Sequence, residues 1–217
     1  MKEKDLMKES KEKEIMAVDV VILLPQNIRE HAIFLSEQLR GSSPIVLNQK
    51  DYLPHISLSM NYIDDVMTTR KIIEQVATQV EPLLITVESL SRGAKPFEGH
   101  YFYGLSIKES EPLKKLHNSL VDALPNVTVE KPNSTYFLPE SDGKIVQAVY
   151  DYVGSFRTHH SKENYHPHIT LGASPTDQLK DDHLPLQFMA DTMYLCQLGN
   201  FCTCRKILAE FPLGKKQ

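Results

Sequence analysis

Strand-like runs of apolar residues recur along much of the chain. The β-branched run Ala17–Leu24, bounded by Pro25, predicts a buried strand. The same pattern predicts four further strands and three shorter extended segments: Leu83–Leu90, Tyr101–Ile107, Phe188–Cys196 and Cys202–Phe211, then Ile45–Leu47, His55–Met60 and His168–Leu171.

Other stretches repeat apolar residues every three or four positions, as helices with one buried face do. One helix is predicted at Ile28–Leu39, after the capping residue Asn27 and before Gly41. The others are a helix between Asp64 or Asp65 and Pro82, then Glu111–Leu124 and Lys144–Phe156. Residues 125–143 and 159–165 should be irregular, and 176–183 a loop or short helix. This mixture predicts an α+β protein with mainly antiparallel sheets.

The first residues differ in character from the rest of the chain. Residues 1–14 are dense in Lys and Glu and predict a charged flexible tail, which leaves 15–217 as a single domain. The apolar run that follows contains Asp19 and precedes no small-residue cleavage site, so it predicts a strand and not a signal peptide. Since no apolar stretch has the length of a membrane span, we expect no membrane contact. We also expect the protein to be a monomer.

Composition and charge narrow the possible partners. Apolar residues make up 41% of the 217 residues, and the formal charge is −4 with histidine neutral. The chain can therefore build a core but lacks the basic field of proteins that coat long duplex nucleic acid. A small or short phosphate-bearing substrate in a local pocket is compatible with this balance.

The cysteines lie in one short C-terminal stretch. Cys196, Cys202 and Cys204 are too few for a disulfide framework, and we expect a reducing, cytoplasmic setting. Cys202 and Cys204 lack both the usual spacing and a second pair for structural zinc. No metal and no other cofactor are therefore expected.

One heptapeptide occurs twice. Residues 52–58 read Tyr-Leu-Pro-His-Ile-Ser-Leu, and residues 165–171 read Tyr-His-Pro-His-Ile-Thr-Leu. Five of the seven positions are identical, and a hydroxyl replaces a hydroxyl at a sixth. The shorter pattern His-x-Ser also occurs at His117 and His159, but on a predicted helix and in a loop. The specificity of the signal therefore comes from the extended copy.

Strand geometry gives the repeat a chemical meaning. Side chains two positions apart on a strand point the same way, so His55 lies beside Ser57, and His168 beside Thr170. One imidazole can be neutral while the other is protonated near neutral pH. Displacement at phosphorus needs such a base and acid on opposite sides. The hydroxyls can donate to the non-bridging oxygens.

A purely structural role is the alternative for each histidine, because most buried polar groups stabilise the fold. That role accounts well for one copy. Packing gives no reason for a histidine beside a hydroxyl in both copies, so we favour His55 and His168 as an acid/base pair. Which of them is the base stays open at this stage.

The two copies resemble the paired motifs of the 2H phosphoesterase superfamily, which includes bacterial 2′–5′ RNA ligase-like proteins and cyclic phosphodiesterases. The resemblance covers about residues 16–213 and implies a bilobal fold of two antiparallel sheets with outer helices, related by pseudo-twofold symmetry around a central cleft. The motif histidines are 113 residues apart, longer than in compact members, with the added length expected in Leu124–Gly143 and Ser155–Tyr165.

The resemblance also implies an activity. It implies metal-independent hydrolysis of 2′,3′-cyclic phosphates or of 2′–5′ linked or terminal RNA phosphodiesters. His55 and His168 carry over as acid and base, and Ser57 and Thr170 as phosphate-oxygen donors. The expected partners are RNA ends, oligonucleotides or small cyclic nucleotides. Two alternatives use the same residues: an RNA ligase that joins a 2′,3′-cyclic phosphate to a 5′-hydroxyl, and a module that binds RNA ends without catalysis.

Further residues are candidates for substrate contact. Tyr103 and His166 are the two that we predict to bind substrate. Tyr103 belongs to an aromatic and basic group that either stacks a base or fills a core edge, with Lys95, Phe97 and Tyr101. His166 lies in a crowded set that fits either a metal site or a polar cleft rim, with His159, His160 and His168. Four residues of the possible insertions are unranked: Lys131, Tyr136, Arg157 and Lys162.

Overall fold

Two four-stranded antiparallel sheets form the frame of the protein. The computed structural model describes residues 14–94, 99–125, 127–131, 133–139, 143–175 and 179–214, so the predicted tail lies almost wholly outside the described residues. The first sheet has the order β2 (His55–Ile63), β1 (Met16–Leu23), β7 (Thr192–Leu198) and β8 (Cys204–Pro212). The second has the order β5 (His168–Ser174), β4 (Tyr101–Ile107), β3 (Leu83–Arg92) and β6 (Leu186–Ala190).

The two sheets follow the same plan. If β1 is matched with β4 and β2 with β5, each motif strand is an edge strand that pairs antiparallel with the inner strand preceding it in the chain. The two copies of the heptapeptide therefore lead into equivalent edge strands. Strands β2 and β5 contact one another where the sheets meet. The α+β, bilobal arrangement predicted from the sequence is confirmed.

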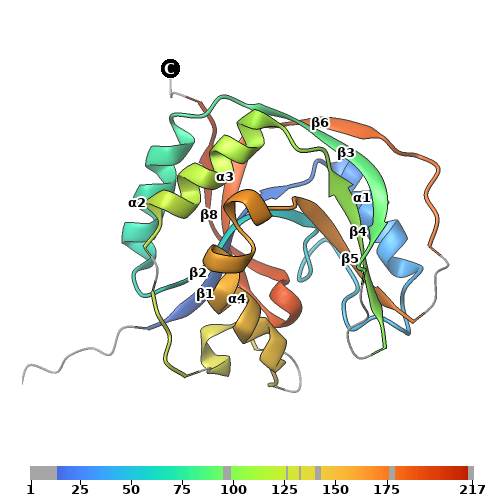
Figure 1. The fold of residues 1–217 in the computed structure, drawn as a ribbon, viewed down its shortest axis with the longest axis horizontal. Coiled ribbons are helices and arrows are strands. Elements are labelled where there is room, and N and C mark those ends of the chain that lie inside the picture. Colours follow the sequence, from blue (N-terminus) through green and yellow to red (C-terminus); the bar gives the residue numbers. More distant parts are fainter. Residues whose placement is uncertain are drawn as a thin grey trace, which may run out of the picture.

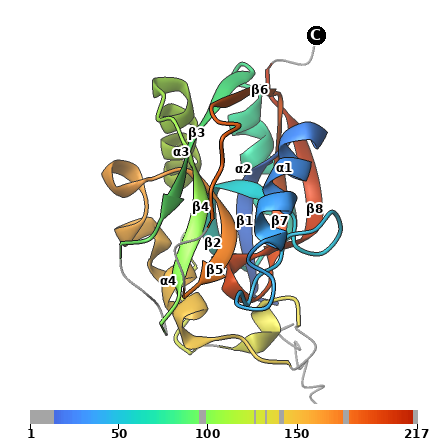
Figure 2. The ribbon, with the colours of Figure 1, turned by 90° about the vertical axis from the view of Figure 1, so that its right-hand side faces the viewer.

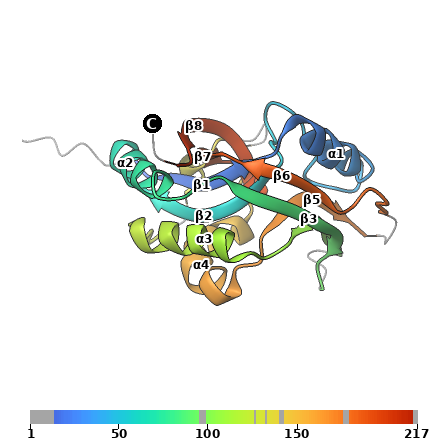
Figure 3. The same ribbon diagram turned by 90° about the horizontal axis from the view of Figure 1, so that it is seen from above.

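The helices cross between the halves. Helix α1 (Gln26–Glu37) follows β1 but packs on β5, whereas α3 (Glu111–Ala123) follows β4 and packs on β2. Helix α2 (Val66–Ala77) packs against α3 and β8. Figure 1 shows the second sheet curving around one side of the molecule, with α2 and α3 on the other. Figure 2 looks onto α1, and Figure 3 shows α3 and α4 (Gln147–His159) on the side away from it.

The main core lies between the sheets and three of the helices. Strand β1 alternates cleanly: Val18, Val20 and Ile22 belong to this core, while Ala17 and Asp19 point to the other face of the first sheet. A smaller core covers that face, where α4 and the segment before it pack on β2 through Phe137, Val149, Val153 and Phe156. Phe137 and Phe156 belong to the two segments predicted to hold the added length, 124–143 and 155–165, and helix α4 completes the same layer between them.

Several local predictions need correction. The apolar run 188–196 is two strands in different sheets, β6 and β7, because the chain crosses between sheets at Asp191 without a turn residue to signal it. Ile45–Leu47 is a buried loop and not a strand. Helix α1 begins after Pro25 without a side-chain cap, so Asn27 is not its cap, whereas Asp65 caps α2 as expected. Helix α4 lies three residues later than predicted at each end.

The cysteine prediction was also wrong in one respect. Cys196 on β7 and Cys204 on β8 form a disulfide, which lies beside Val21 and Leu53 in a small buried cluster. Antiparallel pairing of the two strands brings these residues together, which the clustered spacing alone did not reveal. Cys202 is the free thiol among the described residues. None of the helices in the described ranges combines the length and the apolar character needed to span a bilayer.

Candidate active site

The two motif histidines occupy the first positions of β2 and β5, where the sheets meet. Ile56 and Ile169, the next residues in each strand, are fully buried in the main core. Strand alternation therefore turns His55 and Ser57, and likewise His168 and Thr170, to the opposite face. All four side chains line one cleft of about 610 Å³. The structure thus brings together the four residues that the repeat singled out.

Each motif imidazole is held in the same way. His55 Nδ1 lies 2.8 Å from the carbonyl oxygen of Leu53, and His168 Nδ1 lies 2.8 Å from that of His166. A carbonyl oxygen can only accept, so Nδ1 must carry the hydrogen in both rings. Nε2 is then the nitrogen that can take or give a proton in the cleft.

The two rings differ in their contact with water. The His55 side chain keeps only 12% of its surface exposed, whereas His168 is exposed at the rim. Burial lowers the pKa of His55 to about 4, the hydrogen bond to Leu53 opposes this shift, and the nearby His168 lowers the pKa further. Such a histidine is neutral at physiological pH, which suits a proton acceptor.

Asp19 is the residue that sequence reasoning missed. It lies on β1 behind the cleft wall, is fully buried, and places Oδ2 3.9 Å from Nε2 of His55. Among the described residues, no donor meets hydrogen-bond geometry with its carboxylate. Burial raises its pKa to about 7, although the Ser57 hydroxyl and nearby backbone amides lie close enough to lower it in part. In the sequence, Asp19 interrupts an apolar run and argues against a signal peptide, but no local pattern indicates that it lies near His55.

A side chain on each crossing helix anchors the motif strand of the other half. Ser36 on α1 donates to the carbonyl of Leu171, the last residue of the second motif copy, at 2.6 Å. His117 on α3 donates from Nδ1 to the carbonyl of Leu58, the last residue of the first copy, also at 2.6 Å. These two contacts are called the crossed anchors below. They hold both motif strands at matched positions.

His117 is a structural histidine. Its Nε2 accepts from the backbone amide of Lys162 at 2.9 Å, so both ring nitrogens have partners. The ring stacks on Tyr165 with centroids 3.7 Å apart, and the Tyr165 hydroxyl donates to the carbonyl of Ser57 at 2.8 Å. The His-x-Ser pattern at this position therefore supports the first motif strand from behind and does not reach the cleft.

Tyr103 and His166, the two residues predicted to bind substrate, both line the cleft but differ in their exposure to solvent. Tyr103 is only 2% exposed and forms part of a wall. The His166 side chain is 81% exposed, 3.7 Å from Glu109 at the rim. Arg92, which the sequence did not single out, also lines the cleft, with its guanidinium over the Tyr101 ring at 4.5 Å.

From the sequence, six further residues are candidates for substrate contact. Lys95 and Phe97 lie outside the described residues. None of Lys131, Tyr136, Arg157 and Lys162 lines the cleft, and two of these have partners elsewhere: Arg157 bonds the carbonyl of Leu124, and Lys162 pairs with Asp122. Helix α4 and the residue after it instead contribute three rings to the cleft wall: Tyr152, Phe156 and His160.

The cleft is suited to an anion. No aspartate or glutamate occurs among the described residues that line it, whereas Arg92 and several histidines do. This contrasts with the net charge of −4 for the whole chain. The crowded histidines His159, His160, His166 and His168 do not meet as a ligand group. In the described part of the chain, three such ligand atoms come together only at His31, Asp181 and His183, away from the cleft.

Comparison with known proteins identifies the family. The model of the 2′-5′ RNA ligase superfamily matches residues 51–198, more than half of the chain, and this range includes both motif copies. The chain belongs to this superfamily, the 2H phosphoesterases.

Solved structures agree on the fold. TT0787 of Thermus thermophilus is similar with a TM-score of 0.61 and 14% identity, over 93% of this chain and 100% of that one. E. coli LigT in its apo form has a TM-score of 0.51 and 16% identity, over 93% of this chain and 99% of LigT. A comparison with curated proteins finds no match.

Proposed function

We propose that the protein is a metal-independent phosphodiesterase that hydrolyses 2′,3′-cyclic phosphates or 2′–5′ linked or terminal RNA phosphodiesters. The observation that carries the proposal is the cleft itself. It is lined by two imidazoles in the same tautomer and two hydroxyls, from equivalent edge strands. Superfamily membership supports a phosphoesterase activity in general, and the arrangement of these side chains motivates the narrower reaction.

The difference in burial supports our assignment of His55 as the base and His168 as the acid. His55, kept neutral by burial, accepts a proton at Nε2 from the attacking water as the water oxygen bonds to phosphorus. The bond from phosphorus to the 2′ or 3′ oxygen breaks, and His168 gives its Nε2 proton to that oxygen. Exposure of His168 keeps solvent around its charged form, which suits the acid. A 2′,3′-cyclic phosphate thus becomes a 2′- or 3′-monophosphate.

The hydroxyls and the cleft wall serve the phosphate and the nucleoside. Ser57 and Thr170 donate to the non-bridging oxygens, where a single such donor is worth about 10²–10³ in kcat. His166 at the rim contacts the substrate, and Tyr103 contributes to the wall that the base meets. The cleft volume of about 610 Å³ lies within the range of small-molecule sites. E. coli LigT has been crystallised with ATP and with phosphate, which makes both useful competitors to test.

In the test, the purified chain is incubated in EDTA with each of three substrates. These are 2′,3′-cyclic AMP, 2′–5′ linked oligoadenylate and RNA ending in a cyclic phosphate. We expect monophosphate or hydrolysed RNA as product, and a loss of about 10²–10⁴ in kcat for His55→Ala and for His168→Ala. His159→Ala is the matched control, since His159 is exposed and does not line the cleft. Loss of activity in EDTA with recovery in zinc, under conditions where the chain stays folded in EDTA, would refute the metal-independent reaction.

The same assay distinguishes the alternatives. Addition of an RNA with a 5′-hydroxyl end would yield a joined product if ligation dominates, because the acid and base exchange roles in the reverse reaction. Tight binding of the cyclic-phosphate RNA without any product would favour a binding module. We propose hydrolysis because both imidazoles and both hydroxyls of the motif copies reach one cleft.

A cytoplasmic location and a monomeric state also stay proposals. The Cys196–Cys204 disulfide weighs against a reducing compartment, since disulfides persist mainly in oxidising ones. Cell fractionation followed by thiol labelling of the freshly isolated protein measures both the location and the state of the pair.

A further inference from the structure

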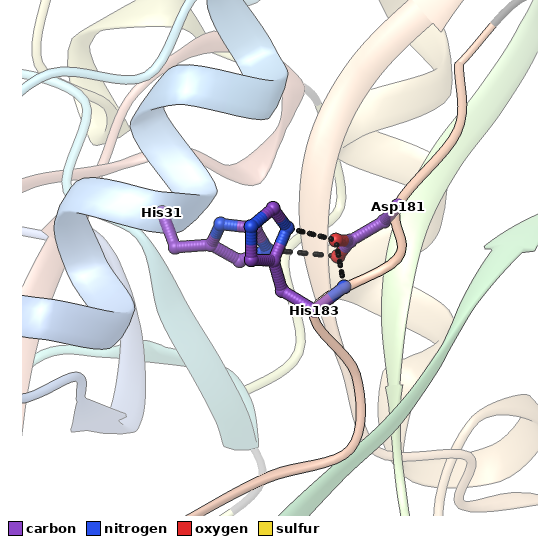
Figure 4. A group of neighbouring side chains, drawn as sticks. All are labelled: His31, Asp181 and His183. Carbon is purple, nitrogen blue, oxygen red and sulfur yellow. Dashed lines mark hydrogen bonds and ion pairs between the residues drawn. The ribbon is translucent and has the colours of Figure 1, made fainter.

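A group of possible metal ligands lies outside the cleft. His31 is on helix α1, while Asp181 and His183 are on the segment between β5 and β6. Figure 4 shows the three side chains pointing toward one another from these two segments. None of them lines the cleft, so the proposed reaction leaves the group unexplained.

The distances fit a small metal ion. Asp181 Oδ2 lies 2.8 Å from His31 Nε2, and Asp181 Oδ1 lies 3.3 Å from His183 Nδ1. One ligand atom from each residue can be chosen so that all three lie within 4.8 Å of one another. Tetrahedral zinc with ligands at 2.0–2.1 Å places them about 3.3 Å apart. The side chains therefore need only small rotations to surround an ion.

The charge of the group favours a cation. The Asp181 side chain has no exposed surface, and its two carboxylate oxygens contact His31 and His183. A buried carboxylate needs a compensating positive charge. Within the described ranges its ion-pair partners are His31 and His183, which carry charge only when protonated. A divalent ion held by the three side chains would supply that charge.

We propose that His31, Asp181 and His183 form a structural binding site for zinc or a similar divalent transition ion. Two imidazole nitrogens and one carboxylate oxygen are the donor set that such ions prefer over magnesium or calcium. The His183 side chain is 75% exposed, so water can complete the coordination. The His183 amide, which donates to Asp181 at 3.0 Å, holds the carboxylate in place.

The bound ion would join α1 to the segment that follows β5. Helix α1 already holds β5 through Ser36, one of the crossed anchors. Fixing the outer side of this helix should stabilise the fold without entering the chemistry. The inference does not depend on the proposed function, since binding and stability are measured without substrate.

The test uses the full chain, stripped with EDTA and titrated with zinc by calorimetry and by thermal unfolding. We expect one zinc per chain and a Tm rise of about 5–10 °C when free zinc exceeds Kd about 100-fold. His183→Ala, which changes an exposed side chain, and Asp181→Asn should each weaken binding at least about 10-fold. His159→Ala, the exposed control, should bind like the original chain.

Two results would overturn the proposal. One is the absence of stoichiometric binding at micromolar zinc, which would leave the group as a proton-dependent ion pair. The other is binding that survives in His183→Ala but disappears in His168→Ala, which would place the ion in the cleft.

Discussion

Replacing Asp19 by Asn tests the electrostatics of the cleft most directly. The substitution keeps the shape of the side chain but removes its ability to ionise. In the original chain the pKa values of Asp19 and His55 are about 7 and about 4, a difference worth about 4 kcal/mol. Coulomb attraction between a carboxylate and an imidazolium 3.9 Å apart is also about 4 kcal/mol at an effective dielectric constant of about 20.

These two free energies are of similar size, so an ionised Asp19 can offset much of the effect of burial on His55. The pair then titrates as a unit, with its last proton lost near pH 7. When Asp19 is ionised, it stabilises the imidazolium that forms as His55 accepts a proton. Without it, burial alone sets the basicity of His55, and the pKa stays near 4. The variant should therefore be a base weaker by about three pKa units.

Two measurements detect the lower basicity of His55 in Asp19→Asn. The pH dependence of kcat/KM for 2′,3′-cyclic AMP should rise through a midpoint near pH 7 in the original chain and near pH 4 in Asp19→Asn, with a plateau about 10- to 10³-fold lower. NMR titration of the His55 ring should show the same shift without substrate. Asp51→Asn, an exposed acid of the same charge, is the control. Identical midpoints for Asp19→Asn and the original chain would refute the reasoning.

Asp19→Asn should lower activity but make the folded state more stable at alkaline pH. The folded pKa of Asp19 lies above its ordinary value of 3.8, so the folded state holds the proton longer than the unfolded chain does. Stability from this group is therefore lost as pH rises from about 4 to about 7, by roughly 4 kcal/mol in all. Asp19→Asn removes the loss, and at pH 8 it should unfold at higher urea than the original chain. Equal stability of the two at pH 8 would contradict the burial argument.

Three further substitutions probe the site and its supports. Thr170→Val should lower kcat about 10²–10³-fold with an unchanged melting curve, and equal kcat would exclude a phosphate contact. Tyr165→Phe leaves a backbone carbonyl without its donor and should cost about 1–3 kcal/mol in urea unfolding. Gly104→Ala places a Cβ 2.9 Å from the carbonyl oxygen of Ile169, so it should lower stability by about 1–3 kcal/mol and also lower kcat. Gly154→Ala is the control: its Cβ would lie 3.9 Å from the Tyr62 ring, an ordinary contact, and it should do neither.

The placement of the motif side chains followed from the sequence because it depends on a local rule. Alternation along a strand turns His55 and Ser57 to one face wherever the strand lies, and the repeat predicts the same for His168 and Thr170. The structure adds that both strands are sheet edges in contact. The catalytic roles of the four residues stay predictions until activity is measured.

Other features depend on long-range pairing that no local pattern contains. Asp19 comes near His55 only because β1 pairs with β2 in a particular register. The crossing at Asp191 and the disulfide between Cys196 and Cys204 depend on which sheet each strand joins. His31 and Asp181 are 150 residues apart, so their meeting was invisible in the sequence.

The crossed anchors have a consequence for how substrates enter. Ser36 and His117 tie each half to the strand of the other at the carbonyls of Leu171 and Leu58. Since α1 follows β1 but is bonded to β5, and α3 follows β4 but is bonded to β2, the connections and the bonds together limit how far the two sheets can move apart. The gap between the two motif histidines should therefore change little, and we expect the cleft to discriminate between ligands by their width.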